Sequence, residues 1–173
     1  MGKLGFVKIL VIAAEAGRVT RKYPYEPPLV SSDFRGKIEI DETKCIGCGS
    51  CVLACPPNAL VMSDEGEGYR VLKYFIGRCI FCWRCIDVCP VDAIKGTREF
   101  ELATDNVEDL DEAVIHKRAS CTECNGLYST VKQKAYVMEK APITENYVDK
   151  CPECRRNKLL RAFEKRRGGE SLE

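Results

Sequence analysis

The twelve cysteines are the residues of this sequence best suited to chemistry, and their spacing divides them into three sets of four. The first set is Cys45, Cys48, Cys51 and Cys55. The second set is Cys79, Cys82, Cys85 and Cys89. The third set is Cys121, Cys124, Cys151 and Cys154. In a chain without a secretory signal pattern, regular spacing of this kind favours metal binding over disulfides. The sequence therefore predicts three metal sites.

The first two sets both read C-x2-C-x2-C-x3-C-P, the pattern that binds [4Fe–4S] clusters in bacterial two-cluster proteins. Cysteines with two residues between them let one tight loop bind three iron corners of a cluster. The fourth cysteine lies too far along the loop to bind the same cluster and ligates the other one. We therefore expect the first cluster on Cys45, Cys48, Cys51 and Cys89. We expect the second cluster on Cys79, Cys82, Cys85 and Cys55. Thiolates are soft ligands that suit iron–sulfur iron.

The two sets belong to an internal repeat, because each cysteine of the first set lies 34 residues before its counterpart in the second. The proline after each set keeps the same offset, which indicates two copies of one supersecondary unit. Gly47 and Gly49 in the first copy suit a loop whose backbone approaches a cluster closely. The equivalent residues of the second copy are Phe81 and Trp83, which we expect to shield the second cluster from water.

The third set consists of two C-x2-C pairs with 26 residues between them. Two such pairs build a tetrahedral site of four sulfurs, as in zinc ribbons. Asn125, Gly126 and Pro152 suit the turns that hold the pairs. We expect a structural Zn²⁺, because a segment this short needs a metal to fold. The alternatives are rubredoxin-type iron, another iron–sulfur cluster, and a site that is empty or closed by disulfides.

The elements that must position these cysteines are predicted to be short. Residues 4–17 are expected to form a helix, and residues 18–36 an extended arm that contains prolines. Strands are expected at 37–40, 60–62 and 69–75, with short helices starting inside the cysteine loops. The acidic residues 104–116 suit either a helix or a linker, and a basic helix is expected near the C-terminus. The predicted class is α+β.

Composition argues against several other functions. Lys plus Arg number 27 and Asp plus Glu number 26, so the basic excess of a nucleic-acid binder is missing. No apolar run reaches the roughly 18 residues of a membrane span, and no glycine-rich nucleotide-binding run occurs. The one histidine, His116, is expected to be a surface or linker side chain, with a stray metal ligand as the alternative. We therefore do not expect an enzyme with its own active site.

A family resemblance lies in residues 37–95, which look like a two-cluster ferredoxin domain, and in the arm before them. The run VTRKYPYEPP followed by FRGKIEI resembles the two-cluster subunit of respiratory complex I and of its relatives, the archaeal membrane-bound hydrogenases and sulfane reductases. The resemblance covers roughly residues 1–100, and residues 101–173 depart from it. It implies an electron-transfer subunit of a membrane-bound oxidoreductase, with a small Fe–S subunit and a large catalytic subunit as partners. It further implies an external donor such as ferredoxin and a peripheral position on the cytoplasmic face of the cell membrane.

The expected fold is therefore a two-cluster bacterial ferredoxin-like core with an N-terminal helix and arm and a C-terminal zinc-ribbon-like extension. The expected divisions are a helix and partner-docking arm (1–36), a ferredoxin domain (37–100), an acidic linker (101–116) and a metal-binding extension of four cysteines with a basic tail (117–173). The alternative function is a freestanding soluble ferredoxin. Residues 1–36 discriminate, because a soluble carrier has no use for an apolar helix and a long arm. Membrane-interface binding and packing on the protein's own core are the other readings of that helix.

Overall fold

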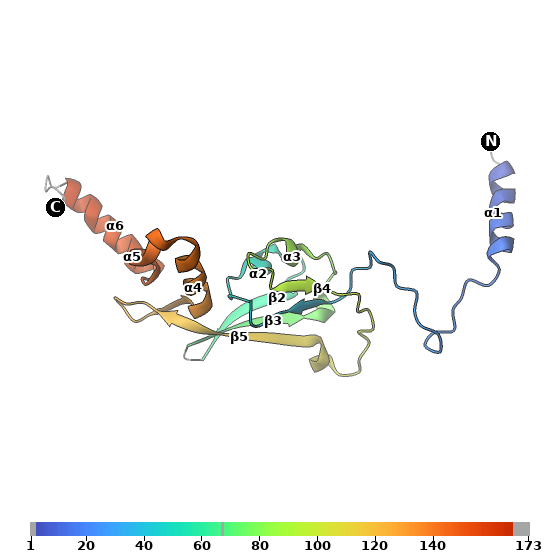
Figure 1. Cartoon of the computed structure of the whole chain (residues 1–173), viewed down its shortest axis with the longest axis horizontal. Coiled ribbons are helices and arrows are strands. Elements are labelled where there is room, and N and C mark those ends of the chain that lie inside the picture. Colours follow the sequence, from blue (N-terminus) through green and yellow to red (C-terminus); the bar gives the residue numbers. More distant parts are fainter. Residues whose placement is uncertain (1–2, 67, 168–173) are drawn as a thin grey trace. The chain divides into compact units, whose positions relative to one another are not determined.

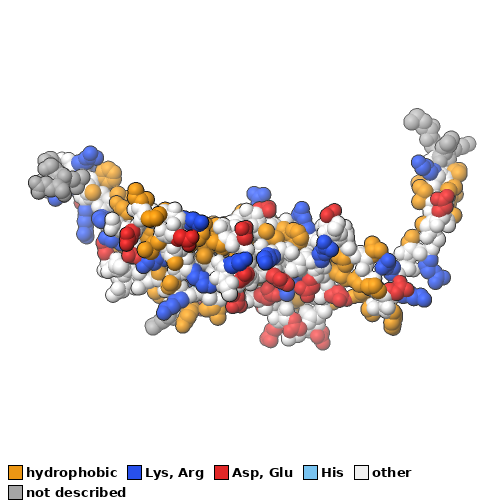
Figure 2. Space-filling view, in the orientation of Figure 1, with side chains coloured by type: hydrophobic (Ala, Val, Ile, Leu, Met, Phe, Trp, Pro, Cys, Tyr) orange, Lys and Arg blue, Asp and Glu red, His pale blue; other side chains and the backbone are white. Residues whose placement is uncertain are grey.

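The computed structural model describes residues 3–66 and 68–167, and it divides the chain into two compact units, Met1–Phe34 and Arg35–Glu173. The first unit holds one helix, α1 (Lys3–Ala16), followed by a stretch of turns and extended backbone (Figure 1). The helix expected at residues 4–17 is therefore present, one residue earlier at each end. Hydrophobic side chains are exposed along α1 (Figure 2); they include Phe6, Val7, Ile9, Leu10, Val11 and Ile12. None of the described helices is long and apolar enough to cross a membrane.

The second unit contains two antiparallel sheets. The smaller sheet pairs β1 (Ile38–Ile40) with β4 (Ile94–Gly96). The larger sheet has the order β2–β3–β5–β6, made of β2 (Leu60–Glu65), β3 (Tyr69–Phe75), β5 (Asp111–Ser120) and β6 (Leu127–Thr130). Two short helices, α2 (Ser50–Ala54) and α3 (Arg84–Asp87), begin inside the first and second cysteine loops. Mixed helix and sheet confirm the α+β class.

Strand β5 is where the acidic stretch differs from expectation, since a helix or a linker was predicted up to residue 116. Residues Val107–Leu110 form a 3-10 turn, η2, and the chain then pairs with β3 along seven residues. Val114 and His116 point inward, whereas Ile115 between them is exposed. Local sequence does not reveal this strand because its partner lies more than 35 residues earlier, and strand preference depends on such context.

The C-terminal part is mostly helical rather than ribbon-like. It contains α4 (Val131–Lys140), the 3-10 turn η3 (Pro142–Thr144), α5 (Glu145–Val148) and α6 (Pro152–Arg167). The Thr130 side chain caps α4 by accepting a hydrogen bond from the Gln133 backbone N–H at 3.0 Å. The basic helix is therefore confirmed as far as Arg167, and residues 168–173 of the predicted tail lie outside the described residues. The first cysteine pair of the extension lies between β5 and β6 in the sequence, whereas the second pair lies at the start of α6.

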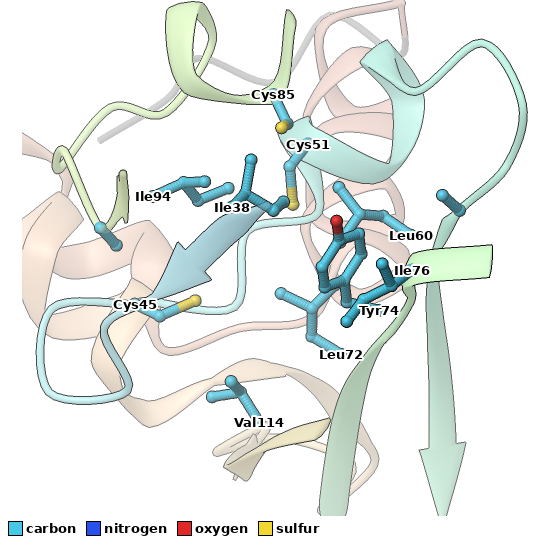
Figure 3. Close-up of a cluster of buried hydrophobic side chains, with 12 residues drawn as sticks. Ile38, Cys45, Cys51, Leu60, Leu72, Tyr74, Ile76, Cys85, Ile94 and Val114 are labelled. Atoms are coloured by element: carbon cyan, nitrogen blue, oxygen red, sulfur yellow. The ribbon is translucent and has the colours of Figure 1, made fainter. Parts of the chain in front are cut away.

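The main core lies between the two sheets and the cysteine loops, and cysteines are part of it (Figure 3). Its most buried members are Ile38, Leu60, Leu72, Tyr74, Ala59 and Ala93. Burying a large apolar side chain contributes about 1.5–3 kcal/mol, so these residues fix the surrounding loops. Cys45, Cys51 and Cys85 pack within the same cluster. Folding of the core therefore places thiols where they can bind metal.

Candidate metal centres

Eight cysteines surround two cavities, and each cavity takes three cysteines from one loop and a fourth from the other. The first cavity is lined by Cys45, Cys48, Cys51 and Cys89, with Met62, Leu72, Val91 and Ile94. The second cavity is lined by Cys79, Cys82, Cys85 and Cys55, with Ile38, Leu60, Tyr74 and Trp83. The structure thus brings together the same two groups of four thiols that the spacing suggested. Their surroundings are apolar, as a thiolate-bound cluster requires for insulation from water.

The repeat extends from the sequence to the backbone. The fourth cysteine of each set accepts a backbone N–H hydrogen bond of 3.2 Å, from Ala59 to Cys55 Sγ and from Ala93 to Cys89 Sγ. Residues with positive φ also occur 34 positions apart, as Gly47 and Phe81, Gly49 and Trp83, and Asn58 and Asp92. Bulky side chains rarely adopt this left-handed region, so the second loop pays a conformational cost that glycine avoids in the first.

Trp83 shows how the second loop compensates for its strained backbone. Its indole N–H donates a hydrogen bond of 3.0 Å to the Gly36 carbonyl, and the ring covers Gly96, where an added Cβ would lie 2.5 Å from it. The Arg35 guanidinium lies 5.9 Å from the ring centroid. The expected shielding of the second cavity by Trp83 is consistent with its place in the lining, while Phe81 packs against the core.

The four cysteines of the third set come together just beyond Ser120, the last residue of β5. Their sulfur atoms all lie within 4.8 Å of one another. Asn125, with φ of +55°, lets the chain turn so that the Cys121 N–H donates to the Gly126 carbonyl at 2.9 Å. The Cys151 N–H donates to Cys121 Sγ at 3.2 Å, and this bond is the main reason that the pKa of Cys121 falls to about 6. Four convergent thiols, one already favouring the thiolate, suit a tetrahedral metal ion.

Comparison with known proteins places this arrangement in a family. The model of the 4Fe-4S dicluster domain family matches residues 44–93. Formate hydrogenlyase subunit 6 of Escherichia coli (strain K12) is 39% identical over 164 residues, which cover 90% of this chain and 89% of that protein. The chain belongs to the family of this subunit. NAD(P)H-quinone oxidoreductase subunit I of Prochlorococcus marinus (strain AS9601) is 37% identical over 149 residues, covering 78% of this chain and 72% of that protein.

A solved structure of the membrane-bound sulfane sulfur reductase, an archaeal respiratory membrane complex, contains a chain with 31% identity and a TM-score of 0.45. That match covers 64% of this chain and 58% of the other chain. Members of the formate hydrogenlyase subunit 6 and subunit I family are iron–sulfur subunits, so this chain is an electron-transfer subunit of a membrane oxidoreductase complex and not its catalytic subunit. The family resemblance seen in the arm and the cysteine loops is confirmed.

One expectation about the extent of this family is wrong. Residues 101–173 were expected to depart from it, yet the match with formate hydrogenlyase subunit 6 covers 90% of the chain and must continue well into them. The extension is therefore shared with at least that relative. The C-x2-C-x2-C-x3-C-P pattern of the first two sets does not reveal this similarity, because the extension carries two C-x2-C pairs instead.

The subunit has buried groups that fit an iron–sulfur cluster in each cavity. Burial, reinforced by neighbouring thiols, raises the pKa of Cys51 to about 12 and that of Cys85 to about 11. These thiols hold their protons at neutral pH until a metal displaces them. The fully buried Tyr74 hydroxyl has no hydrogen-bond partner of proper geometry among the described residues, and it lines the second cavity. A sulfur of a bound cluster would provide that partner.

His116 is buried beside Cys45, a lining residue of the first cavity, so the expectation of a surface or linker side chain is wrong. It is 2% exposed, and its Nε2 lies 3.5 Å from Cys45 Sγ. Burial, with Lys132 and Arg70 nearby, lowers the pKa of His116. The contact joins residues 71 positions apart through the β3–β5 pairing. Nothing in the local sequence signals it.

At Gly47, His116 of β5 and Thr130 of the extension both pack against the first cysteine loop. Its φ is +66°, and an added Cβ would lie 2.9 Å from both His116 Cδ2 and Thr130 Cγ2. We expect Gly47→Ala to lower the free energy of unfolding by more than the about 1–3 kcal/mol of a left-handed alanine alone. Urea unfolding of the metal-loaded protein, with iron content measured alongside, checks this.

Gly49→Ala is the matched control for this substitution. Gly49 has φ of +79°, but its Cβ would meet only Met62 Sδ, at 3.8 Å. Gly49→Ala should therefore lower the free energy of unfolding only by the cost of placing alanine in the left-handed region. Equal losses in the two variants would contradict the close packing of His116 and Thr130 on the loop.

Proposed function

We propose that this chain binds two [4Fe–4S] clusters with crossed ligation and relays electrons within a hydrogenase-type membrane complex. The observation that carries the proposal is the pair of cavities, each lined by three thiols of one loop and one of the other, in a relative of formate hydrogenlyase subunit 6. When bound, the clusters supply one-electron transfer. The chain supplies the ligands, the insulation and the position.

The spacing along the two short helices supports direct relay between the cavities. Cys51 lines the first cavity and Cys55 the second, and these residues stand one helical turn apart at α2. Cys85 lies in α3 and lines the second cavity, whereas Cys89, two residues past the end of α3, lines the first. Side chains at such a spacing are separated by roughly 6 Å. The two sites are therefore neighbours, enclosed by the same apolar core.

The third set is proposed to hold Zn²⁺ in a structural role. Support comes from the four sulfurs within 4.8 Å and from the backbone N–H groups that favour the Cys121 thiolate. Zinc has no redox chemistry, so the ion would fasten the turn at Asn125 to the start of α6. Rubredoxin-type iron would use the same four thiols, and metal analysis distinguishes the two.

The first unit is proposed to dock on partner subunits. Apolar side chains are exposed along α1, which suggests that other protein surfaces cover this helix. We propose a small Fe–S subunit as the acceptor, a large catalytic subunit beyond it, and reduced ferredoxin as the donor. The chain would then be held peripherally on the cytoplasmic face of the membrane through these partners.

Deletion of residues 1–34 tests the docking proposal. The cut belongs after Phe34, because Arg35 donates to the Cys82 carbonyl at 3.2 Å and Gly36 bonds both Thr97 and Trp83. We expect the full-length tagged chain to purify anaerobically from solubilised membranes with hydrogenase-like subunits, identified by mass spectrometry. The shortened chain should keep its iron and move to the soluble fraction.

Two outcomes would contradict this function. A full-length chain that purifies alone from the soluble fraction would favour a freestanding ferredoxin. Loss of iron from the shortened chain would mean that residues 1–34 support the clusters rather than the partners. Removing residues 35 and 36 as well is the informative comparison, because it should disturb the second cysteine loop.

A further inference from the structure

We infer that His116 sets the reduction potential of the cluster on Cys45, Cys48, Cys51 and Cys89 by donating its Nε2–H to Cys45 Sγ. This inference rests on the proposed function, since it requires a cluster at those four cysteines. His116 is a positioning and tuning residue and not a ligand. It belongs to β5, outside both cysteine loops, and the 4Fe-4S dicluster match at 44–93 does not include it.

The direction of the hydrogen bond follows from the chemistry of the two groups. A thiolate bound to iron can only accept, so the ring nitrogen 3.5 Å away must donate. The bond therefore requires a proton on Nε2. The buried Nδ1 has no partner among the described residues, so no competing protein acceptor holds the proton there. Both groups are buried, with Cys45 9% and His116 2% exposed.

Several contacts fix the first cysteine loop next to the His116 ring. The Thr130 hydroxyl donates to the Ile46 carbonyl, next to Cys45. Lys132 Nζ donates to the Glu42 carbonyl at 2.6 Å. The close approach at Gly47 leaves no room for the loop to move toward the ring. His116 of β5 and Thr130 and Lys132 of the extension therefore all contact the first cysteine loop or the residues just before it, and together they fix the geometry of the His116 contact.

The expected effect on the cluster follows from charge. Reduction adds an electron and makes the sulfurs more negative, so an N–H donor stabilises the reduced form more than the oxidised form. The bond therefore raises the potential of the first cluster. Cys79, which corresponds to Cys45 in the repeat, receives a backbone N–H from Phe81 at 3.4 Å, and the nearby aromatic residue is Tyr74. The first cluster therefore has an imidazole donor where the second cavity offers the Tyr74 hydroxyl.

Substitution of His116 tests the inference in the full chain. In His116→Leu, we expect the equilibrium constant for reducing the first cluster to fall by about tenfold, which is about 59 mV for one electron. The second cluster should be unchanged and serves as the internal reference in an EPR-monitored redox titration. His116→Gln, which keeps an N–H donor, should restore part of the shift.

Tyr74→Phe is the matched control, because it removes a buried polar group at the second cavity only. A shift of the first cluster in this variant equal to that in His116→Leu would mean that any core substitution moves it, and would overturn the assignment. Unchanged potentials in His116→Leu would overturn it as well.

A second measurement needs no substitution. His116 is the only histidine of the chain, so growth on ¹⁵N-histidine labels a single residue. Pulsed EPR of the reduced, full-length protein should show weak ¹⁵N coupling in the signal of one cluster and none in the other. Absence of coupling from both signals would overturn the inference, even if His116→Leu fails to fold. If the unsubstituted protein lacks two clusters by iron analysis, it is the proposed function that fails instead.

Discussion

Cys55→Ala is expected to abolish the second cluster, although Cys55 belongs to the first cysteine motif, and Cys89→Ala is expected to abolish the first. Each variant should lose about half of the bound iron, because one of two clusters goes. The reason is geometric, since Cys55 faces the cavity of Cys79, Cys82 and Cys85. Iron analysis and EPR of the anaerobically purified variants measure both the amount and the identity of the remaining cluster.

Two further variants make the assignment unambiguous. Cys82→Ala removes a ligand of the second cavity, and Cys48→Ala removes a ligand of the first, whichever way the fourth cysteines are shared. With crossed ligation, the EPR spectrum of Cys55→Ala matches that of Cys82→Ala, and Cys89→Ala matches Cys48→Ala. The opposite pairing of spectra would show that each loop binds its own cluster, and the proposed arrangement would be wrong.

The elements that sequence predicts well are those specified locally. Helix α1 follows from a mostly apolar run, and β3 has the predicted bounds of 69–75 because turn residues Gly66 and Gly68 precede it and a cysteine loop follows. The grouping of thiols is likewise a consequence of spacing within a repeat. For the helix and the strand, the residues that determine the structure lie within a few positions of one another; for the thiols, the repeat supplies the fourth member of each group from the other loop.

The features that sequence misses depend on contacts between distant parts of the chain. β5 forms because β3 offers an unpaired edge, and its own residues include charged and exposed side chains that do not signal a strand. His116 becomes buried only once β5 is in place. Gly47 illustrates both levels, because its type was noticed in the loop, whereas the reason that a side chain is excluded there is supplied by His116 and Thr130.

Loss of the third metal is expected to unfold the extension and to loosen the first cluster as well. The extension has few buried apolar side chains of its own near the metal, with Val148 the main one beside Cys121 and Cys151. A structural Zn²⁺ contributes about 10–16 kcal/mol in small zinc domains, far more than such a core can replace. Without the metal, the contacts of Thr130 and Lys132 with the loop at Ile46 and Glu42 should weaken.

Cys151→Ser measures this dependence. We expect less than one-tenth of the zinc of the unsubstituted chain, since a tenfold loss requires only about 1.4 kcal/mol, and rapid proteolysis between residues 121 and 151. The first cluster should be lost to a chelator several times faster than before, because each broken hydrogen bond costs roughly 1 kcal/mol. The second cluster should keep its original rate, because the hydrogen bonds of Thr130 and Lys132 go to Ile46 and Glu42, at the first cysteine loop.

Glu123→Gln is the control. Glu123 lies between Cys121 and Cys124 in the sequence, but its carboxylate pairs with Lys150 and is not one of the four metal-binding groups. It should retain zinc and leave both clusters unaffected. Cys151→Ser could lose its zinc while a chelator still removes the first cluster at the original rate. The extension and the first cysteine loop would then be independent, and the contacts of Thr130, Lys132 and His116 would not stabilise the cluster. If both clusters become labile together, the metal supports the whole fold rather than the first cysteine loop.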